Sequence, residues 1–147
     1  MATTTFSGPI KAGTIRDGAD ANVGFVLMAQ SANVVFGDDG STTVVATVPA
    51  NSQIYQIAVD VTTAFNAATT NTFDLGDGTT ADQYADALNV SSAARVLATS
   101  DVSQIGNLID IGTSDVDVTV TYNQTGTAAT AGAATVTVLY IQNNNLS

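Results

Sequence analysis

The chain has 147 residues, a length that suits one domain with a substantial hydrophobic core. Its net charge is −10, from 13 acidic residues that are all aspartate and three basic residues, and it has no histidine, cysteine, tryptophan or glutamate. This composition argues against a Lys/Arg surface for nucleic acid, excludes a cysteine-based metal site and leaves few groups for catalysis. We therefore expect a protein that is not an enzyme, holds no cofactor or metal and binds no nucleic acid.

Residues 1–20 predict an extended N-terminal arm. They combine isolated apolar residues with Pro9 and three glycines, which suits a segment lying on a neighbouring chain better than a strand within a sheet. Residues 1–22 are neutral overall, whereas the rest of the chain has one arginine and eleven aspartates. We predict that the arm makes adhesive contacts and that residues 21–147 form a single β-sandwich domain. The predicted contact residues are Phe6, Pro9, Ile10, Lys11, Ile15 and Arg16.

The chain shows no sign of a targeting or membrane segment. Its N-terminus has neither the basic region nor the apolar core of a secretory signal, and no run approaches the roughly 18 apolar residues that span a bilayer. We expect a protein without a secretory address and without a membrane partner.

Short segments rich in Val, Ile, Thr and Tyr recur along the chain. Clusters of Gly, Asn, Asp or Ser separate them, which is typical of an all-β sandwich or barrel. The predicted strands are residues 22–30, 32–36, 42–48, 53–61, 72–75, 93–98, 115–122 and 133–141.

Two of these segments alternate between apolar and polar residues, as a half-buried strand does. In residues 115–122 every second residue is Val or Tyr, and the others are Asp or Thr. In residues 53–61 the same reasoning puts Ile54 on the less apolar face. The residues predicted to form the buried face of that strand are Tyr55, Ile57, Val59 and Val61.

The first and last predicted strands are apolar on both faces. They read NVGFVLMAQ and AATVTVLYI. A strand in a two-layer sandwich buries only one face, so the second face is either central or meets another subunit. We favour contact with another subunit.

The remaining segments predict one helix and one long loop. Residues 82–89 are the only segment that suits a short helix, which Asp82 would cap. Residues 123–133 are too long for a two-residue hairpin and too small and polar to pack, which predicts a mobile tip.

Two aspartate–glycine motifs raise the question of a metal or catalytic site: DDG at residues 38–40 and DLGDG at residues 74–78. An EF-hand loop needs a longer D-x-[DN]-x-[DN]-G pattern with a distant Glu, and neither motif provides it. Asp-Gly is a strong turn signal because tight turns need positive φ. We interpret both motifs as tight turns.

Other residues leave two alternative functions open. Asp115 and Asp117 share a strand face about 7 Å apart, so they could hold a cation or act as a glycosidase-like pair. Solvated carboxylates on a strand face are far more common, and we rank a hydrolase last. Tyr84 and Tyr122 are the aromatic residues available for a glycan-binding platform.

Three stretches cover nearly the whole chain: the leader TTFSGPIKAGTIRDG followed by NVGFVLMAQ, the central IAVDVTTAFNAATTNTFDLGDGTTADQYADALNVSSAARV, and the closing VTVTYNQTGTAATAGAATVTVLYIQ. They resemble small structural proteins of tailed bacteriophages, especially those of marine and cyanobacterial phages. Proteins of this kind are similar to capsid decoration, or cement, proteins: compact β-rich domains, commonly jelly rolls forming trimers, on the outside of the expanded head.

The resemblance implies an all-β, two-sheet antiparallel sandwich that is jelly-roll-like and carries an extended N-terminal arm. It implies a structural virion protein on the capsid surface, made in the host cytoplasm, that binds the major capsid protein as a homotrimer and stabilises the lattice through inter-subunit contacts. The arm would lie on the capsid or on a sister subunit. The alternative is a phage tail, fibre or collar module that binds a host-surface glycan.

Overall fold

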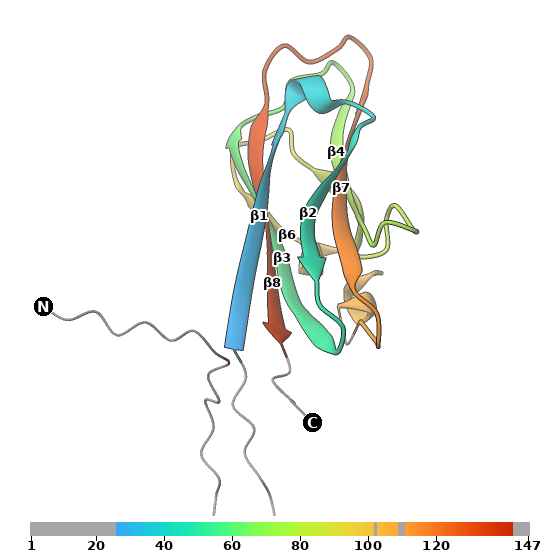
Figure 1. Cartoon of the computed structure of the whole chain (residues 1–147). Coiled ribbons are helices and arrows are strands. Elements are labelled where there is room, and N and C mark those ends of the chain that lie inside the picture. The colour runs from blue at the N-terminus through green and yellow to red at the C-terminus, as the bar shows by residue number, and fades with distance from the viewer. Residues whose placement is uncertain (1–25, 102, 109–110, 143–147) are drawn as a thin grey trace, which may run out of the picture.

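A computed structural model describes residues 26–101, 103–108 and 111–142, which form eight strands and three short 3-10 helices (Figure 1). The strands are β1 (Val26–Val35), β2 (Thr42–Val48), β3 (Ser52–Thr63), β4 (Thr70–Gly76), β5 (Ala85–Asn89), β6 (Arg95–Leu97), β7 (Val116–Thr125) and β8 (Ala133–Gln142). The 3-10 helices are η1 (Phe36–Asp38), η2 (Ala98–Ser100) and η3 (Ile105–Asn107). No helix in this described part of the chain has the length and apolar character needed to cross a membrane.

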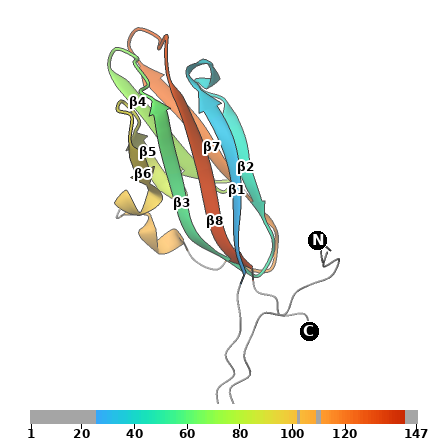
Figure 2. The same cartoon turned by 90° about the vertical axis from the view of Figure 1, so that its left-hand side faces the viewer.

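The strands form two four-stranded antiparallel sheets that pack face to face (Figure 2). The first sheet has the order β1-β8-β3-β6, and the second sheet has the order β2-β7-β4-β5. Only β4 and β5 are consecutive in the chain and adjacent in a sheet, so every other connection crosses between the sheets. The predicted all-β, two-sheet antiparallel sandwich is therefore confirmed.

The hydrophobic core lies between the two sheets. Three aromatic rings from different parts of the chain, Phe65, Phe73 and Tyr122, pack with centroid separations of 4.6 to 5.8 Å in tilted or edge-to-face geometry. Aliphatic side chains fill the rest of the core. Its other large buried residues include Val34, Val48, Ile54, Ile57, Val59, Leu75, Val90, Val118, Val120, Val136 and Val138.

Strand β7 confirms the core face predicted for residues 115–122 at three positions, because Val118, Val120 and Tyr122 are buried. On the opposite face Asp117 is exposed as predicted, but Thr119, which was predicted to face water, is buried. Local alternation is enough here because β7 pairs with both neighbours over most of its length, with one register shift on the β2 side.

The prediction for β3 is wrong at its first residues. A register shift between Ile54 and Gln56 marks a β-bulge, which inserts one extra residue into the strand. Ile54 is therefore buried, and Tyr55 is 64% exposed. A bulge exchanges the two faces of a strand on one side of it, so the alternation after residue 56 cannot be extended back to Tyr55.

Two predicted strands, residues 22–30 and 32–36, are one strand over their described part. β1 pairs with β8 in an unbroken register from Val26 to Val35. Ser31 does not interrupt it, because its hydroxyl forms a 3.0 Å hydrogen bond with the hydroxyl of Thr137 on β8.

The helix predicted for residues 82–89 is wrong, because Ala85–Asn89 form strand β5. Ala85 and Leu88 are both buried, and their spacing of three resembles a helical face. In the structure Ala87 has φ 50° and the register with β4 shifts, so an extra residue brings both side chains to the core side. The Ala87 N–H donates to Oδ1 of Asp74 at 2.9 Å, which holds this irregular backbone in place.

The loop between β7 and β8 packs on the sandwich, contrary to the prediction that it is too small and polar to do so. Ala129 and Gly132 are buried, and the N–H groups of Thr130 and Ala131 donate to Oδ1 of Asn66 at 2.8 and 3.0 Å. The loop is thus bound to the segment that follows β3.

Candidate functional site

The DDG motif is a turn between the two sheets. Ser41 N–H donates to the Asp38 carbonyl at 2.9 Å, Asp39 has φ −52° and ψ 128°, and Gly40 has φ 69°. These values describe a type II turn, in which glycine takes the position that needs positive φ. The carboxylates serve the same corner: Oδ2 of Asp38 accepts the Val35 N–H at 2.8 Å, and Oδ1 of Asp39 accepts the Gln124 N–H at 3.1 Å.

The DLGDG motif is also a turn, at the end of β4. Oδ1 of Asp77 accepts the N–H groups of Thr79 and Thr80 at 2.8 and 2.7 Å, and Gly78 has φ 81°. One carboxylate oxygen thus replaces a backbone acceptor and closes the loop. The interpretation of both motifs as tight turns is confirmed, although neither joins two strands as a two-residue hairpin.

Asp115 and Asp117 each bind a different group on the β2 side of the sheet. Oδ1 of Asp115 accepts the Ala50 N–H at 2.9 Å, and Oδ1 of Asp117 accepts the Thr47 hydroxyl at 2.6 Å. Among the residues that the structure describes, no group of three or more potential metal-ligating side chains comes together. The aspartates therefore have structural partners.

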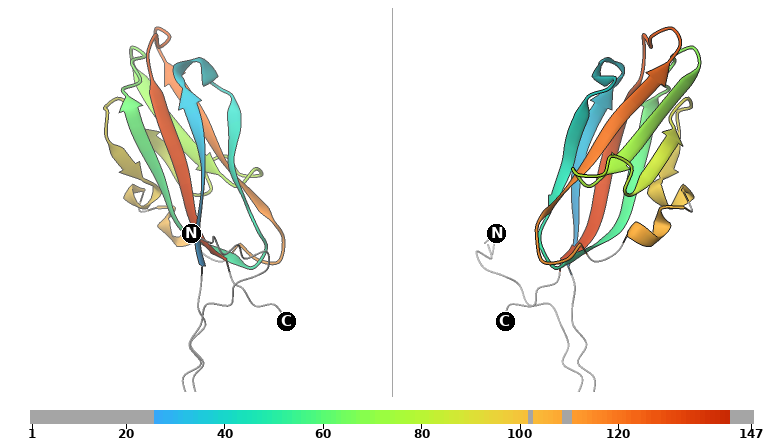
Figure 3. Two further views of the ribbon diagram at one scale, coloured as in Figure 1. Left: turned by 60° about the vertical axis from the view of Figure 1, so that its left-hand side comes forward. Right: turned by 90° about the vertical axis from the view of Figure 1, so that its right-hand side faces the viewer.

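The outer face of the second sheet is polar and rich in threonine; the right-hand view of Figure 3 looks onto it, with β7 in orange and β4 in yellow-green. Pairs of side chains form hydrogen bonds across neighbouring strands. They are Thr42 with Thr121 at 2.9 Å, Thr70 with Thr125 at 2.7 Å, Thr47 with Asp117 at 2.6 Å and Asn123 with Asp74 at 2.6 Å. This face suits contact with water.

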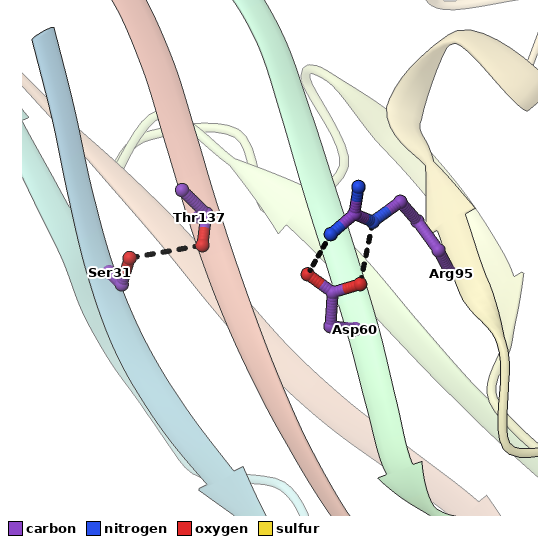
Figure 4. Close-up of polar contacts among 4 residues, drawn as sticks. All are labelled: Ser31, Asp60, Arg95 and Thr137. Atoms are coloured by element: carbon purple, nitrogen blue, oxygen red, sulfur yellow. Dashed lines mark hydrogen bonds and ion pairs between the residues drawn. The ribbon is translucent and has the colours of Figure 1, made fainter.

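The outer face of the first sheet combines polar pairs with apolar side chains. Figure 4 shows two of the pairs: Ser31 with Thr137, and Arg95 with Asp60. Arg95 donates through Nε to Oδ1 at 2.6 Å and through a terminal nitrogen to Oδ2 at 3.0 Å. The hydrogen bond from Arg95 lowers the pKa of Asp60 below its ordinary value, and the same bond raises the pKa of Arg95.

Large hydrophobic side chains are exposed at particular places on the surface. Among the described residues, Tyr55 and Leu97 lie on β3 and β6, and five others lie on β1, η1 and β2. These five are Leu27, Met28, Val35, Phe36 and Val44, and Leu27 is 57% exposed. Leu27 lies in the strand that was predicted to have a second apolar face, and its side chain is exposed; contact of that face with another subunit stays a prediction.

No protein-family model and no curated protein matches the chain. Two solved structures do. A chain of the cyanophage Pam1 capsid asymmetric unit superposes with a TM-score of 0.62 at 16% identity, over 92% of this chain and 99% of that chain. The fold is shared with a bacteriophage capsid chain. A chain of the acid-stable capsid of Helicobacter pylori bacteriophage KHP30 superposes with a TM-score of 0.58 at 17% identity, over 81% of this chain and 90% of that chain.

The residues on which the glycan-binding alternative rested are not on the surface. Tyr84 and Tyr122 are 4% and 0% exposed, and burial raises the pKa of both hydroxyls, that of Tyr84 to about 12. The prediction that they are available for a ligand is wrong. The exposed tyrosine is Tyr55, which the β3 bulge turns outward.

The predicted contact residues Phe6, Pro9, Ile10, Lys11, Ile15 and Arg16 lie outside the described residues. Sequence reasoning did not find the exposed side chains of η1 and β2. For η1 the available signal was the charge-free run from Val26 to Gly37, in which three consecutive apolar residues precede Gly37.

Proposed function

We propose that the protein is a capsid decoration, or cement, protein: it binds the outside of a bacteriophage head as a homotrimer and stabilises the lattice of the major capsid protein. One observation carries the proposal, which is the fold shared with a phage capsid chain over nearly the full length of both chains. A second capsid structure with the same fold supports it. Under this proposal the protein is made in the host cytoplasm and resides on the capsid surface.

The strand order supports a jelly roll as the more specific fold. In an eight-stranded jelly roll two Greek keys fill two sheets, so that successive strands mostly alternate between them. The orders β1-β8-β3-β6 and β2-β7-β4-β5 follow that winding.

Adhesion requires surfaces and not catalytic groups. The arm of residues 1–20, with Phe6, Pro9, Ile10, Lys11, Ile15 and Arg16, is the element that we assign to the capsid or a sister subunit. The threonine- and aspartate-rich outer face of the second sheet would face water, where its carboxylates keep particles apart. Buried contacts made only in the assembled shell stabilise that shell by linkage.

The molar ratio of the protein to the major capsid protein in purified virions tests the location. Quantitative mass spectrometry should give a ratio near one if the protein follows the capsid lattice. A ratio lower by an order of magnitude or more would place it at a vertex or on the tail and would contradict the cement role.

Deletion of residues 2–16 tests the arm. The truncated protein should keep the circular dichroism spectrum and melting temperature of the full chain and lose binding to heads in a co-sedimentation assay. The matched control replaces the same 15 residues with a Gly/Ser segment of equal length, which should also fail to bind because the side chains are missing. Unchanged binding by both variants would exclude the arm as the adhesive element.

A further inference from the structure

Strand β1 forms an edge of the first sheet and, within the described residues, pairs with β8 alone (Figure 2). Among the described residues, alternate N–H and C=O groups along this strand therefore have no strand partner on the other side. Proteins normally protect such an edge with charged residues, proline, a bulge or a very short strand, because an open edge is a template for another chain.

Of the four edge strands in the described part of the chain, only β1 lacks all of these protections. β6 has three residues and carries Arg95, β5 has five residues with a bulge and Asp86, and β2 contains a bulge and is followed by Pro49. β1 reads VLMAQSANVV, has no charge, no proline and no glycine, and pairs with β8 without a register shift. β1 is therefore a long edge strand without the usual protection against pairing with another chain.

Exposed hydrophobic side chains lie at both ends of this edge strand. We define the β1 edge strip as the open edge of β1, with Leu27 and Met28 at its start and Val35 and Phe36 at its end; these are four of the seven large exposed hydrophobic residues in the described chain. Between them Ala29, Ser31 and Asn33 are exposed and uncharged. Val44 is not part of the strip, because it pairs with Thr119 on the outer face of the second sheet. An uncharged, unpaired edge with apolar residues at its ends is a surface that another chain can cover.

The distribution of charge indicates which kind of chain could cover the β1 edge strip. No charged residue occurs from Val26 to Gly37, and the first one, Asp38, turns its carboxylate back onto the Val35 N–H. The aspartates of the second sheet lie on its outer face, away from the strip. Two copies of a chain with net charge −10 repel each other at most orientations, but they bring no carboxylates together when they meet at this neutral edge.

We propose that the β1 edge strip is the contact between copies of this chain, with the strip of one copy packed against the strip of another. A neutral edge lets copies meet around a symmetry axis without bringing their carboxylates together. The inference gives the proposed homotrimer its surface and rests on that part of the proposed function, but it does not depend on binding to heads.

Light scattering coupled to size-exclusion chromatography tests the proposal on the full chain. The wild type should have a mass that is a multiple of the monomer mass, and the Leu27→Asp/Val35→Asp double variant should be monomeric at the same concentration. Both side chains are largely exposed, so the variant should keep the wild-type circular dichroism spectrum. Tyr55→Asp is the matched control, because this side chain is 64% exposed but lies on β3, with β8 between it and β1; it should leave the mass unchanged.

A crosslinking measurement gives an independent readout, since the chain has no cysteine. Oxidation of an Ala29→Cys variant should yield disulfide-linked dimers, because equivalent residues of two strips lie close together. A Ser92→Cys variant, exposed on the loop between β5 and β6 at the other edge of the sandwich, should remain a single chain.

Three results would overturn the proposal. They are a monomeric wild type at every concentration, an unchanged multimer in the double variant, or a multimer that is lost on deletion of residues 1–25 and kept in the double variant, which would assign the contact to that segment. Failure of the wild type to bind heads while it remains multimeric would instead contradict only the capsid role.

Discussion

The hydroxyl of Tyr122 on β7 donates a 2.7 Å hydrogen bond to Oδ1 of Asn71 on β4, and both side chains are buried. Asn71 also accepts the Ala67 N–H at 2.9 Å and donates to the Ala67 carbonyl at 3.1 Å. One amide therefore satisfies the irregular backbone after β3 and anchors the aromatic cluster.

Removal of the Asn71 amide should destabilise the protein more than removal of the tyrosine hydroxyl. We expect Asn71→Ala to lower the free energy of unfolding by about 2–3 kcal/mol, because it leaves the buried Ala67 groups without their partner and leaves the Tyr122 hydroxyl only its longer hydrogen bond to Oε1 of Gln124, at 3.2 Å. Tyr122→Phe should cost about 1 kcal/mol. Urea denaturation measures both. Asn123→Ala, on the outer side of β7, is the control and should cost less than about 1 kcal/mol; an equal cost for Asn71→Ala and Asn123→Ala would contradict the anchoring role.

Glycine at position 132 is required by close packing. It has φ 152°, and a Cβ atom there would overlap the ring of Phe65. Gly132→Ala should therefore destabilise the fold by about 2–4 kcal/mol through overpacking and backbone strain, measured by thermal unfolding. Gly37→Ala is the matched control: its Cβ would meet no atom within 4 Å, so its melting temperature should stay near that of the wild type. A small effect at both positions would show that the loop moves away from Phe65 readily.

The raised pKa of the Tyr84 hydroxyl predicts that the protein loses stability in alkaline solution. Burial, with a smaller contribution from the charge of Asp77, raises its pKa from 10 to about 12. The native state therefore holds the proton more tightly than the unfolded state, so this contribution is complete below about pH 10 and is lost as the pH rises toward 12. We expect a decrease of about 1–2 kcal/mol over that range in urea titrations. Tyr84→Phe should flatten this part of the pH profile, and an identical slope in the variant would rule out Tyr84 as the cause.

Substitutions of Asp77 distinguish a structural role in the turn from a role in metal binding. Its Oδ1 accepts two N–H groups, so Asp77→Ala should cost about 1–2 kcal/mol, whereas Asp77→Asn keeps a side-chain oxygen and should cost much less. Differential scanning calorimetry should give the same melting temperature with EDTA and with millimolar Ca²⁺. A rise in melting temperature with Ca²⁺ that Asp77→Asn abolishes would identify a metal site instead.

The local pattern of residues was sufficient to identify some strands and, for one of them, the residues that face the core. Residues 42–48 were predicted as a strand and form β2 with the same bounds, and the alternation in residues 115–122 correctly placed Val118 and Val120 in the core. Alternation, turn motifs and charge are properties of neighbouring residues, so they can be interpreted without knowledge of the fold. They also indicated an all-β sandwich and assigned the Asp-Gly motifs to turns.

Partners distant in sequence decided the features that local patterns could not predict. The β3 bulge is set by pairing with β8, more than 80 residues later, and it exchanges Ile54 and Tyr55. The bend of β5 depends on a carboxylate of β4, and it converts a helix-like spacing into a strand. By itself the sequence determined the class of fold and the neutral, apolar character of the β1 segment. Only the tertiary structure decided that this segment is an open sheet edge in the described part of the chain, because the strands that flank an edge come from elsewhere in the chain.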